Sequence, residues 1–186
     1  MTSPTDAYSV DQFMADARAT YAHLGSTDAG RQALGALLQR LARASDLMPQ
    51  EELAALHGGE ATATLLASDG LEGLTLMLAR FTTPTSVHDH GSWGVACVVQ
   101  GQDRYQRWER LDDGSDATHA EVRMQTEQDL VPGDVVTWSG PPHDLHAQQG
   151  VDGPAWELVL FGRNVTQLPR RYFDPVSGAV RTALPQ

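Results

Sequence analysis

Two histidines near the middle of the chain, His88 and His90, have the spacing of a metal-binding pair. Residues two apart on a strand point to the same face of a sheet, so one short strand can aim both imidazoles at a single point. A third imidazole, that of His146, would complete three neutral nitrogen ligands on one side of a metal ion. Such a set is the nitrogen-only relative of the two-histidine, one-carboxylate arrangement of non-haem iron oxygenases. We therefore predict a metal centre that keeps positions open for substrate or oxygen.

The other four histidines carry different expectations. His23 and His57 lie near the ends of expected helices, where a cationic side chain suits the helix dipole. His119 follows an acidic loop and is expected to face solvent. His143 competes with His146 for the third ligand position, because both lie in or just after the same proline-containing turn. If His146 is the ligand, His143 is either a catalytic or pocket residue beside the metal or an exposed residue of the turn.

The composition limits the function classes. The 186 residues carry 13 basic and 24 acidic side chains, all the basic ones being arginine, for a formal charge of −11. Such an acidic chain is not expected to bind nucleic acid or an anionic membrane. Its single cysteine, Cys97, allows no intramolecular disulfide and is expected to be a buried, inert thiol. Because neither a secretory signal nor a membrane-spanning apolar run is visible, we expect a cytoplasmic protein.

The N-terminal third predicts helices that would pack on the rest of the chain. Between Ser9 and Gly25, apolar residues recur at spacings of three and four, and Ser9 begins a capping box. A second helix is expected over about 28–44 and a short third helix over 49–59. We expect residues 1–60 to form a helical cap whose leucines are buried, with no part in the chemistry.

The character of the chain changes to short strands and turns over residues 61–186. Clusters of Gly, Pro and Asp separate the strands, and strands and helices do not alternate, so a parallel α/β fold is not expected. Many short strands at this spacing are typical of a β-sandwich or barrel. The expected strands are 61–67, 74–81, 94–100, 103–109, 120–128, 135–138, 145–148 and 156–162. We expect this barrel, with a C-terminal extension packed on its edge, to form one structural unit with the cap.

Two blocks of sequence resemble the two conserved motifs of cupins: HDHGSWGVACVVQG at 88–101 and PGDVVTWSGPPHDLH at 132–146. Within the cupins, the chain is most similar to the cysteine dioxygenase-like thiol dioxygenases, particularly bacterial enzymes that act on 3-mercaptopropionate or similar thiols. Those proteins also carry a Trp-Gly or similar pair after HDH and end in an Arg-Arg…Phe-Asp-Pro segment, here at 170–175. The resemblance covers roughly residues 62–175.

This resemblance implies a mainly β fold, a cupin (double-stranded β-helix or jelly-roll) barrel, here with an N-terminal α-helical cap. It also implies one Fe(II) ion held by His88, His90 and His146, which favours His146 over His143 as the third ligand. The glutamate ligand of ordinary cupins falls on Gly94, and its loss is typical of the three-histidine thiol dioxygenases. Three neutral ligands leave the metal more cationic, so an anionic thiolate and oxygen can bind it together.

One part of the family pattern is missing from this chain. Thiol dioxygenases usually carry a Ser-x-His-x-Tyr relay before a late glycine, and those three places hold Glu157, Val159 and Phe161 here. Two interpretations of Glu157 stay open. It is either a replacement catalytic acid or base, with its pKa raised by an apolar pocket, or an outward-facing strand residue.

A substrate carboxylate would need a cation, and two arginines are candidates. Arg170 matches the arginine of the mercaptopropionate-type enzymes, and Arg80 ends the strand before the histidine pair. A guanidinium group grips a carboxylate through two hydrogen bonds, although a surface ion pair is the competing role for either residue. Trp93 and Phe161 are candidate walls of the substrate pocket, with core packing as the alternative for Trp93.

The sequence therefore predicts an Fe(II)-dependent thiol dioxygenase that uses O2 to convert a small carboxylated thiol to a sulfinate. The substrate would resemble cysteine, 3-mercaptopropionate or mercaptosuccinate, and the protein would be a monomer or homodimer. Two alternatives remain. One is another three-histidine iron oxygenase, such as a hydroxylase or a carbon–carbon cleaving enzyme, and the other is a non-redox metal-binding cupin.

Overall fold

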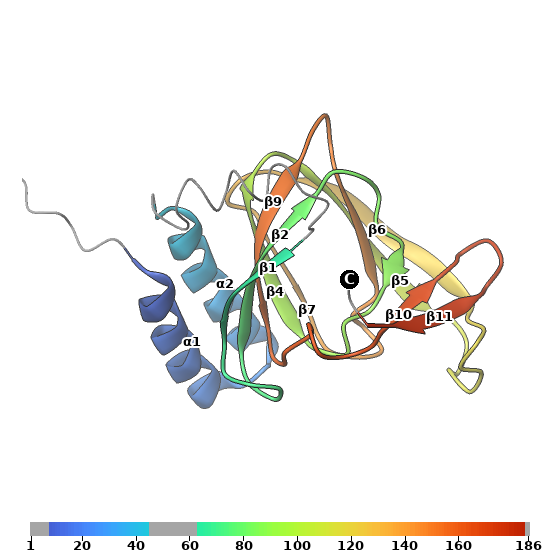
Figure 1. The fold of residues 1–186 in the computed structure, drawn as a ribbon, viewed down its shortest axis with the longest axis horizontal. Coiled ribbons are helices and arrows are strands. Elements are labelled where there is room, and N and C mark those ends of the chain that lie inside the picture. Colours follow the sequence, from blue (N-terminus) through green and yellow to red (C-terminus); the bar gives the residue numbers. More distant parts are fainter. Residues whose placement is uncertain (1–7, 45–62, 185–186) are drawn as a thin grey trace, which may run out of the picture.

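A computed structural model describes residues 8–44 and 63–184 (Figure 1). The expected helix at 49–59, with His57 in it, and the first two residues of the expected strand at 61–67 lie outside the described residues. In the described part of the chain, two helices precede eleven strands, so the prediction of a mainly β fold with N-terminal helices is confirmed. Neither of these helices combines the length and the apolar character that crossing a membrane requires.

Both helices that the structure describes were expected from the sequence. Helix α1 (Val10–Leu24) begins with the expected capping box at Ser9 and ends at Gly25, which has a φ of 61°. Helix α2 (Asp28–Ala42) begins at Thr27, whose side chain accepts a hydrogen bond from a backbone N–H of the first turn. The two helices pack on each other, and α2 also packs on strands β4 and β7 (Figure 1).

The strands form two antiparallel sheets. Their bounds are β1 (Ala63–Ser68), β2 (Thr75–Phe81), β3 (Val87–His88), β4 (Gly94–Gln100), β5 (Asp103–Arg110), β6 (Val122–Leu130), β7 (Val135–Trp138), β8 (His146–Gly150), β9 (Ala155–Phe161), β10 (Arg170–Phe173) and β11 (Val180–Ala183). One sheet has the order β1-β2-β9-β4-β7 and the other β11-β10-β3-β8-β5-β6. Several neighbouring strands, such as β2 and β9 or β3 and β10, are far apart in the sequence, so the sheets bring distant segments together.

Strand β4 lacks polar alternation because both of its faces are buried. Val95 and Cys97 pack in a cluster with α1 and α2, whereas Ala96 and Val98 pack in a second cluster between the two sheets. A strand covered on both sides reads as a continuous apolar run. Cys97 is fully buried, as expected, and burial raises the pKa of its thiol to about 11.

Three strands were not predicted, and two of them lie beside the histidines. Strand β3 has only two residues and ends at His88, so the prediction that one strand carries both His88 and His90 is wrong. The C-terminal segment does pack on a sheet edge, because β10 pairs with β3 and β11 pairs with β10. This hairpin adds a wall to the region around the histidines.

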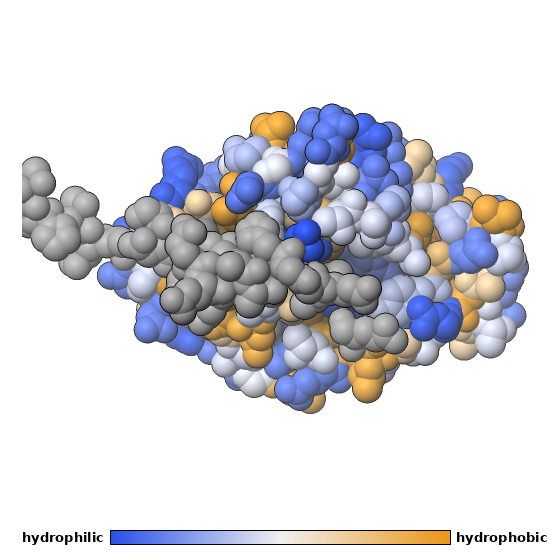
Figure 2. All heavy atoms as spheres, turned by 45° about the horizontal axis from the view of Figure 1, so that its top comes forward, coloured by the Kyte–Doolittle hydropathy of each residue, from blue (hydrophilic) through white to orange (hydrophobic). Residues whose placement is uncertain are grey.

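The face of the molecule drawn in Figure 2 mixes hydrophilic and hydrophobic residues. Large hydrophobic residues that are exposed come from separate places, for example Leu65 in β1, Met124 in β6 and Val176 between β10 and β11. Exposed apolar residues scattered in this way are ordinary for a folded protein and indicate no binding surface by themselves.

Candidate metal centre

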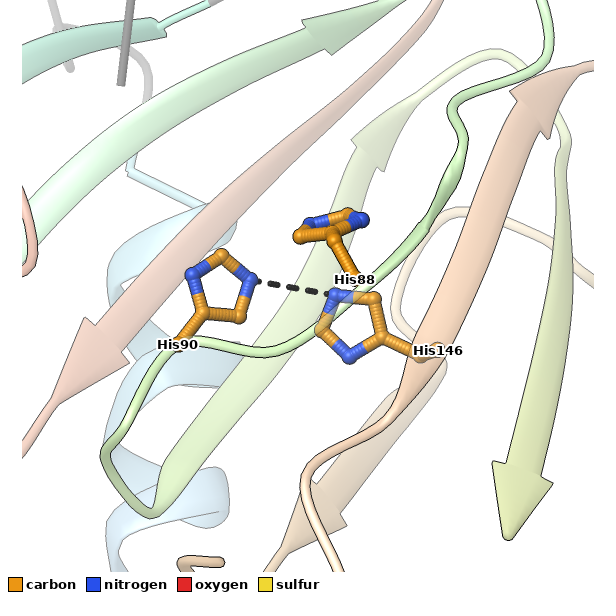
Figure 3. A group of neighbouring side chains, drawn as sticks. All are labelled: His88, His90 and His146. Carbon is orange, nitrogen blue, oxygen red and sulfur yellow. Dashed lines mark hydrogen bonds between the residues drawn. The ribbon is translucent and has the colours of Figure 1, made fainter. Parts of the chain in front are cut away.

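The structure brings His88, His90 and His146 together. One nitrogen of each ring lies within 4.8 Å of those of the other two, and all three side chains are buried. His146 on β8 lies directly opposite His88 on β3, and the three rings point toward one another (Figure 3). The Nε2 atoms of His90 and His146 are 3.1 Å apart. Two segments that are distant in the sequence, 88–90 and the start of β8, therefore supply one cluster of imidazoles.

His90 is positioned by a loop rather than by a strand. The Asp144 carboxylate accepts hydrogen bonds from the backbone N–H groups of His90, at 3.1 Å, and Gly91, at 2.9 Å. Gly91 has a φ of 63°, which favours glycine and turns the chain away after the histidine. Asp144 lies two residues before His146, so the same segment holds one imidazole and orients another.

Asp89, between the two histidines, anchors the loop on its other side. Its carboxylate accepts hydrogen bonds from the backbone N–H of Arg171, at 2.9 Å, and from the Arg171 Nε, at 2.6 Å. The Asp89 side chain is almost fully buried. A buried carboxylate needs such partners, and here they tie the loop to β10.

The protonation of the imidazoles suits metal binding. Burial lowers the pKa of His88 to about 4 and the pKa values of His90 and His146 well below the ordinary value. The rings are therefore neutral near pH 7, which metal coordination requires. The His88 Nδ1 is hydrogen-bonded to the Ser86 carbonyl at 2.9 Å, which leaves its Nε2 for the centre of the cluster.

The hydrogen-bonding capacity of two of the three imidazoles is not fully used inside the protein. The Nδ1 atoms of His90 and His146 are buried and have no hydrogen-bond partner among the described residues. Three neutral imidazoles crowded in this way fit a divalent transition metal, and zinc, copper, iron and nickel all accept imidazole ligands. The donor set therefore fits a metal without selecting iron.

The tryptophan of the second motif fills the space next to Gly94. A Cβ atom at Gly94 would overlap the six-membered ring of Trp138. Trp138 is buried, and its Nε1 donates a hydrogen bond to the Ser92 carbonyl at 3.1 Å. Its ring lies 5.2 Å from that of His146, edge to face. Trp138 therefore excludes a side-chain ligand at position 94, a role that the sequence did not reveal.

A cavity of about 870 Å³ opens beside the three imidazoles. Arg80, Arg170 and Phe161 line it, so the structure places these candidate substrate-binding residues with the histidines. The Phe161 ring lies 4.8 Å from that of His90. Trp93, in contrast, packs in the core cluster with the helices and stacks on Tyr21 at 5.2 Å. The pocket-wall interpretation of Trp93 is therefore corrected to its alternative, core packing.

His143 does not join the cluster. Its side chain is exposed and lines a separate hollow of about 440 Å³ with residues such as Trp108 and Arg110. The interpretation of His143 as a catalytic or third-ligand residue is therefore corrected, because the turn that precedes β8 points it away from the cavity. His23 in the last turn of α1 and the exposed His119 lie where the sequence predicted them.

Glu157 faces inward and lines the cavity, with 1% of its surface exposed. The outward-facing interpretation is therefore wrong. The Gln148 Nε2 lies 2.9 Å from the Glu157 carboxyl and 3.0 Å from that of Asp103, which is also buried. Burial, and next the nearby Asp103, raise the pKa of Glu157 well above its usual range. Burial raises that of Asp103 to about 6. The Asp103 partner was not found from the sequence.

A row of side chains continues from the histidines across the C-terminal hairpin. His146 on β8 is opposite His88 on β3, His88 is opposite Tyr172 on β10, and Tyr172 is opposite Arg181 on β11. Directly opposed residues of antiparallel strands point to the same face, and all four line the cavity. The alternation of Arg170 and Tyr172 along β10 was the only sequence signal that could have indicated this row.

Comparisons with known proteins give only weak likenesses to solved structures. No family model and no curated protein matches the chain. A cupin superfamily protein from Desulfitobacterium hafniense is 21% identical over 63% of this chain and 90% of its own, with a TM-score of 0.40. A Bacillus subtilis oxalate decarboxylase variant is 20% identical over 50% of this chain and 22% of its own, with a TM-score of 0.35. An oxalate oxidase bound to glycolate is 14% identical over 56% of this chain and 53% of its own, with a TM-score of 0.41. One fold hosts many activities, so none carries over from these likenesses.

Proposed function

We propose that the chain is an Fe(II)-dependent thiol dioxygenase that converts a small carboxylated thiol and O2 to a sulfinate. The observation that supports this most is the cavity itself, where three neutral, buried imidazoles face two guanidinium groups, Arg170 and Arg80. In the overall reaction both oxygen atoms of O2 are added to sulfur, which is oxidised while O2 is reduced. The thiol proton leaves as the sulfinate forms.

His88, His90 and His146 would hold the iron, which supplies a Lewis-acidic, redox-active centre open to sulfur and oxygen. Because the three ligands are neutral and Gly94 adds no carboxylate, the ligand set brings no negative charge that would oppose an anionic thiolate. An anionic thiolate would benefit from this uncancelled charge of the metal, whereas a neutral substrate would not.

We propose that Arg170 binds the substrate carboxylate. It lies on β10, on the same side as Tyr172, and its positive charge acts on all three imidazoles. Its Nε is buried and has no hydrogen-bond partner among the described residues. A buried guanidinium N–H without an acceptor is costly, and a substrate carboxylate would supply that acceptor.

Other residues that line the cavity would exclude water from the site and supply a proton. Phe161 and Val159 are buried apolar residues on β9 that keep water from that side of the cavity. Glu157, on the same face of β9, holds a proton near neutral pH and takes the place of the first residue of the missing relay. We propose that it is the acid of the pocket, acting through a bound water, since the strand places it away from Phe161 and the imidazoles.

The test is oxygen consumption by iron-loaded protein with a panel of carboxylated thiols, and mass analysis of the product. We expect a product heavier than the thiol by two oxygen atoms. Arg170→Ala should lower kcat/KM by about ten- to a hundredfold, the worth of a charge-assisted hydrogen bond. The matched control is Arg104→Ala, because Arg104 is partly exposed, pairs with Asp129 and is not among the described residues that line the cavity.

Two outcomes would contradict the proposal. Stoichiometric zinc in protein purified without a histidine tag, with no oxygen uptake after iron loading, would favour a non-redox metal-binding cupin. Oxygen uptake with substrates that lack sulfur, and none with any carboxylated thiol, would favour another three-histidine oxygenase.

A further inference from the structure

Arginines outnumber acidic residues among the described residues that line the cavity. Arg80, Arg170 and Arg181 all line it, and the only acidic residue among its described lining residues is Glu157. Burial raises the pKa of Glu157 well above its usual range, so this carboxyl group is uncharged near pH 7. Three cations therefore face the cavity of a chain whose formal charge is −11.

Most arginines of this protein are neutralised by carboxylates. Eight of them lie within 4.0 Å of an Asp or Glu oxygen: Arg18, Arg31, Arg40, Arg104, Arg110, Arg123, Arg163 and Arg171. Neither Arg170 nor Arg181 has such an ion pair within residues 8–44 and 63–184. In an acidic protein, two cations without a carboxylate on one hairpin indicate a place for an anion from outside.

The register of the hairpin sets the spacing of these two cations. Arg181 is directly opposite Tyr172, and Arg170 lies two residues before Tyr172 on the same face. Arg170 and Arg181 are therefore diagonal neighbours across the β10–β11 pair, a relation that places backbones roughly 7–8 Å apart and long side chains within reach of each other. The guanidinium of Arg181 lies over the Tyr172 ring, 4.7 Å from its centre, which holds it above the cavity.

We propose that Arg181, supported by Tyr172, forms a second anion subsite, and that the substrate carries two carboxylates. This inference rests on the proposed function, because it assigns the substrate of that reaction to the mercaptodicarboxylic acids. One carboxylate lies on Arg170 and the second on Arg181, with the sulfur toward the imidazoles. The row His146, His88, Tyr172 and Arg181 gives the direction in which the substrate lies.

The chemistry of the subsite favours carboxylates over a single phosphate. Two guanidinium groups on diagonal positions offer two separate, planar forks, and each fork matches one carboxylate. A compact phosphate could meet both forks only if the two side chains converge on it, whereas two carboxylates need no such convergence. A short dicarboxylate such as a succinate derivative places its two anionic groups a few bonds apart, so each fork receives its own.

The first experiment measures binding without turnover. Succinate, butyrate and inorganic phosphate are titrated calorimetrically into iron-loaded protein under nitrogen. The two organic probes have chains of equal length and differ by one carboxylate. We expect succinate to bind about tenfold or more tightly than butyrate, and Arg181→Gln to remove that advantage while leaving butyrate binding unchanged. The matched control, Arg104→Gln, should change neither, and Arg181→Lys should restore part of the advantage because it keeps the charge.

Arg181 is exposed, so its substitution should leave the fold intact, which circular dichroism melting checks. Equal binding of succinate and butyrate, or phosphate binding more tightly than succinate, would overturn the proposal. So would an Arg181→Gln protein that still prefers succinate.

The second experiment compares kcat/KM for mercaptosuccinate and 3-mercaptopropionate. We expect the dicarboxylate to be preferred, and Arg181→Gln to lower only the value for mercaptosuccinate, by about tenfold. If both thiols are oxidised with no preference and no effect of Arg181, the second subsite is refuted while the proposed function stands. If succinate binding depends on Arg181 but no thiol is oxidised, the proposed function fails and the dicarboxylate subsite remains.

Discussion

Replacing Glu157 with glutamine should change how the stability of the protein depends on pH. The Glu157 carboxyl is 1% exposed and lies beside the buried Asp103, with Gln148 between them. Burial raises its pKa well above the usual value of 4.5, so the folded protein keeps a proton that the unfolded chain releases above that pH. Glutamine has nearly the same shape, keeps an N–H toward Asp103 and has no proton to lose.

The sign and size follow from proton linkage. The stability that comes from burying neutral Glu157 is fully present below pH 4.5 and is lost as pH rises toward the folded-state pKa. One extra proton in the folded state makes the free energy of unfolding fall by about 1.4 kcal/mol per pH unit. Because the pKa of Asp103 is raised to about 6, its proton adds to the slope only below that pH.

Urea unfolding of metal-free protein, followed by circular dichroism between about pH 6.5 and 8.5, measures this slope. We expect the unfolding free energy of the Glu157→Gln protein to rise relative to the wild type by up to about 1.4 kcal/mol for each pH unit, until the pH reaches the folded-state pKa of Glu157. The control is Glu121→Gln, at an exposed position, which should keep the wild-type slope. If the curves for wild type and Glu157→Gln run parallel, Glu157 is ionised in the folded protein and its assignment as the pocket acid is refuted.

Three further outcomes follow from the geometry of the centre. His146→Ala should lower iron affinity by at least tenfold to a hundredfold, measured by metal analysis and titration, whereas His143→Ala should leave it unchanged because its side chain is exposed. Gly94→Ala should lower the unfolding free energy by about 1–3 kcal/mol or more in denaturant titrations, since its Cβ overlaps an indole, while Gly140→Ala, whose Cβ meets nothing closer than 3.5 Å, should cost much less. Asp89→Asn should cost about 1–3 kcal/mol in the same titrations and weaken iron binding, because it loosens the loop between two ligands; an unchanged iron affinity would contradict that role.

The local features of the fold could be predicted from the sequence because short-range physics sets them. Helix α1 follows from apolar spacing and the capping box at Ser9, and most strands follow from apolar runs between turn residues. The pair His88 and His90 was identified by spacing and by neighbouring glycines, although the strand ends at His88. These signals act within about ten residues of the chain, so they can be recognised in the sequence without knowledge of the tertiary structure.

Only the tertiary structure decided which distant side chains meet. Strand β3 has two residues and carries no periodic signal, yet its pairing with β8 and β10 places His88 between His146 and Tyr172. The exclusion of His143 depends on how one turn enters β8. The raised pKa of Glu157 depends on burial and on β5 bringing Asp103 close to β9, where Gln148 donates a hydrogen bond to both carboxyl groups. Strand register sets each of these contacts, and register depends on the packing of whole sheets rather than on any local run of residues.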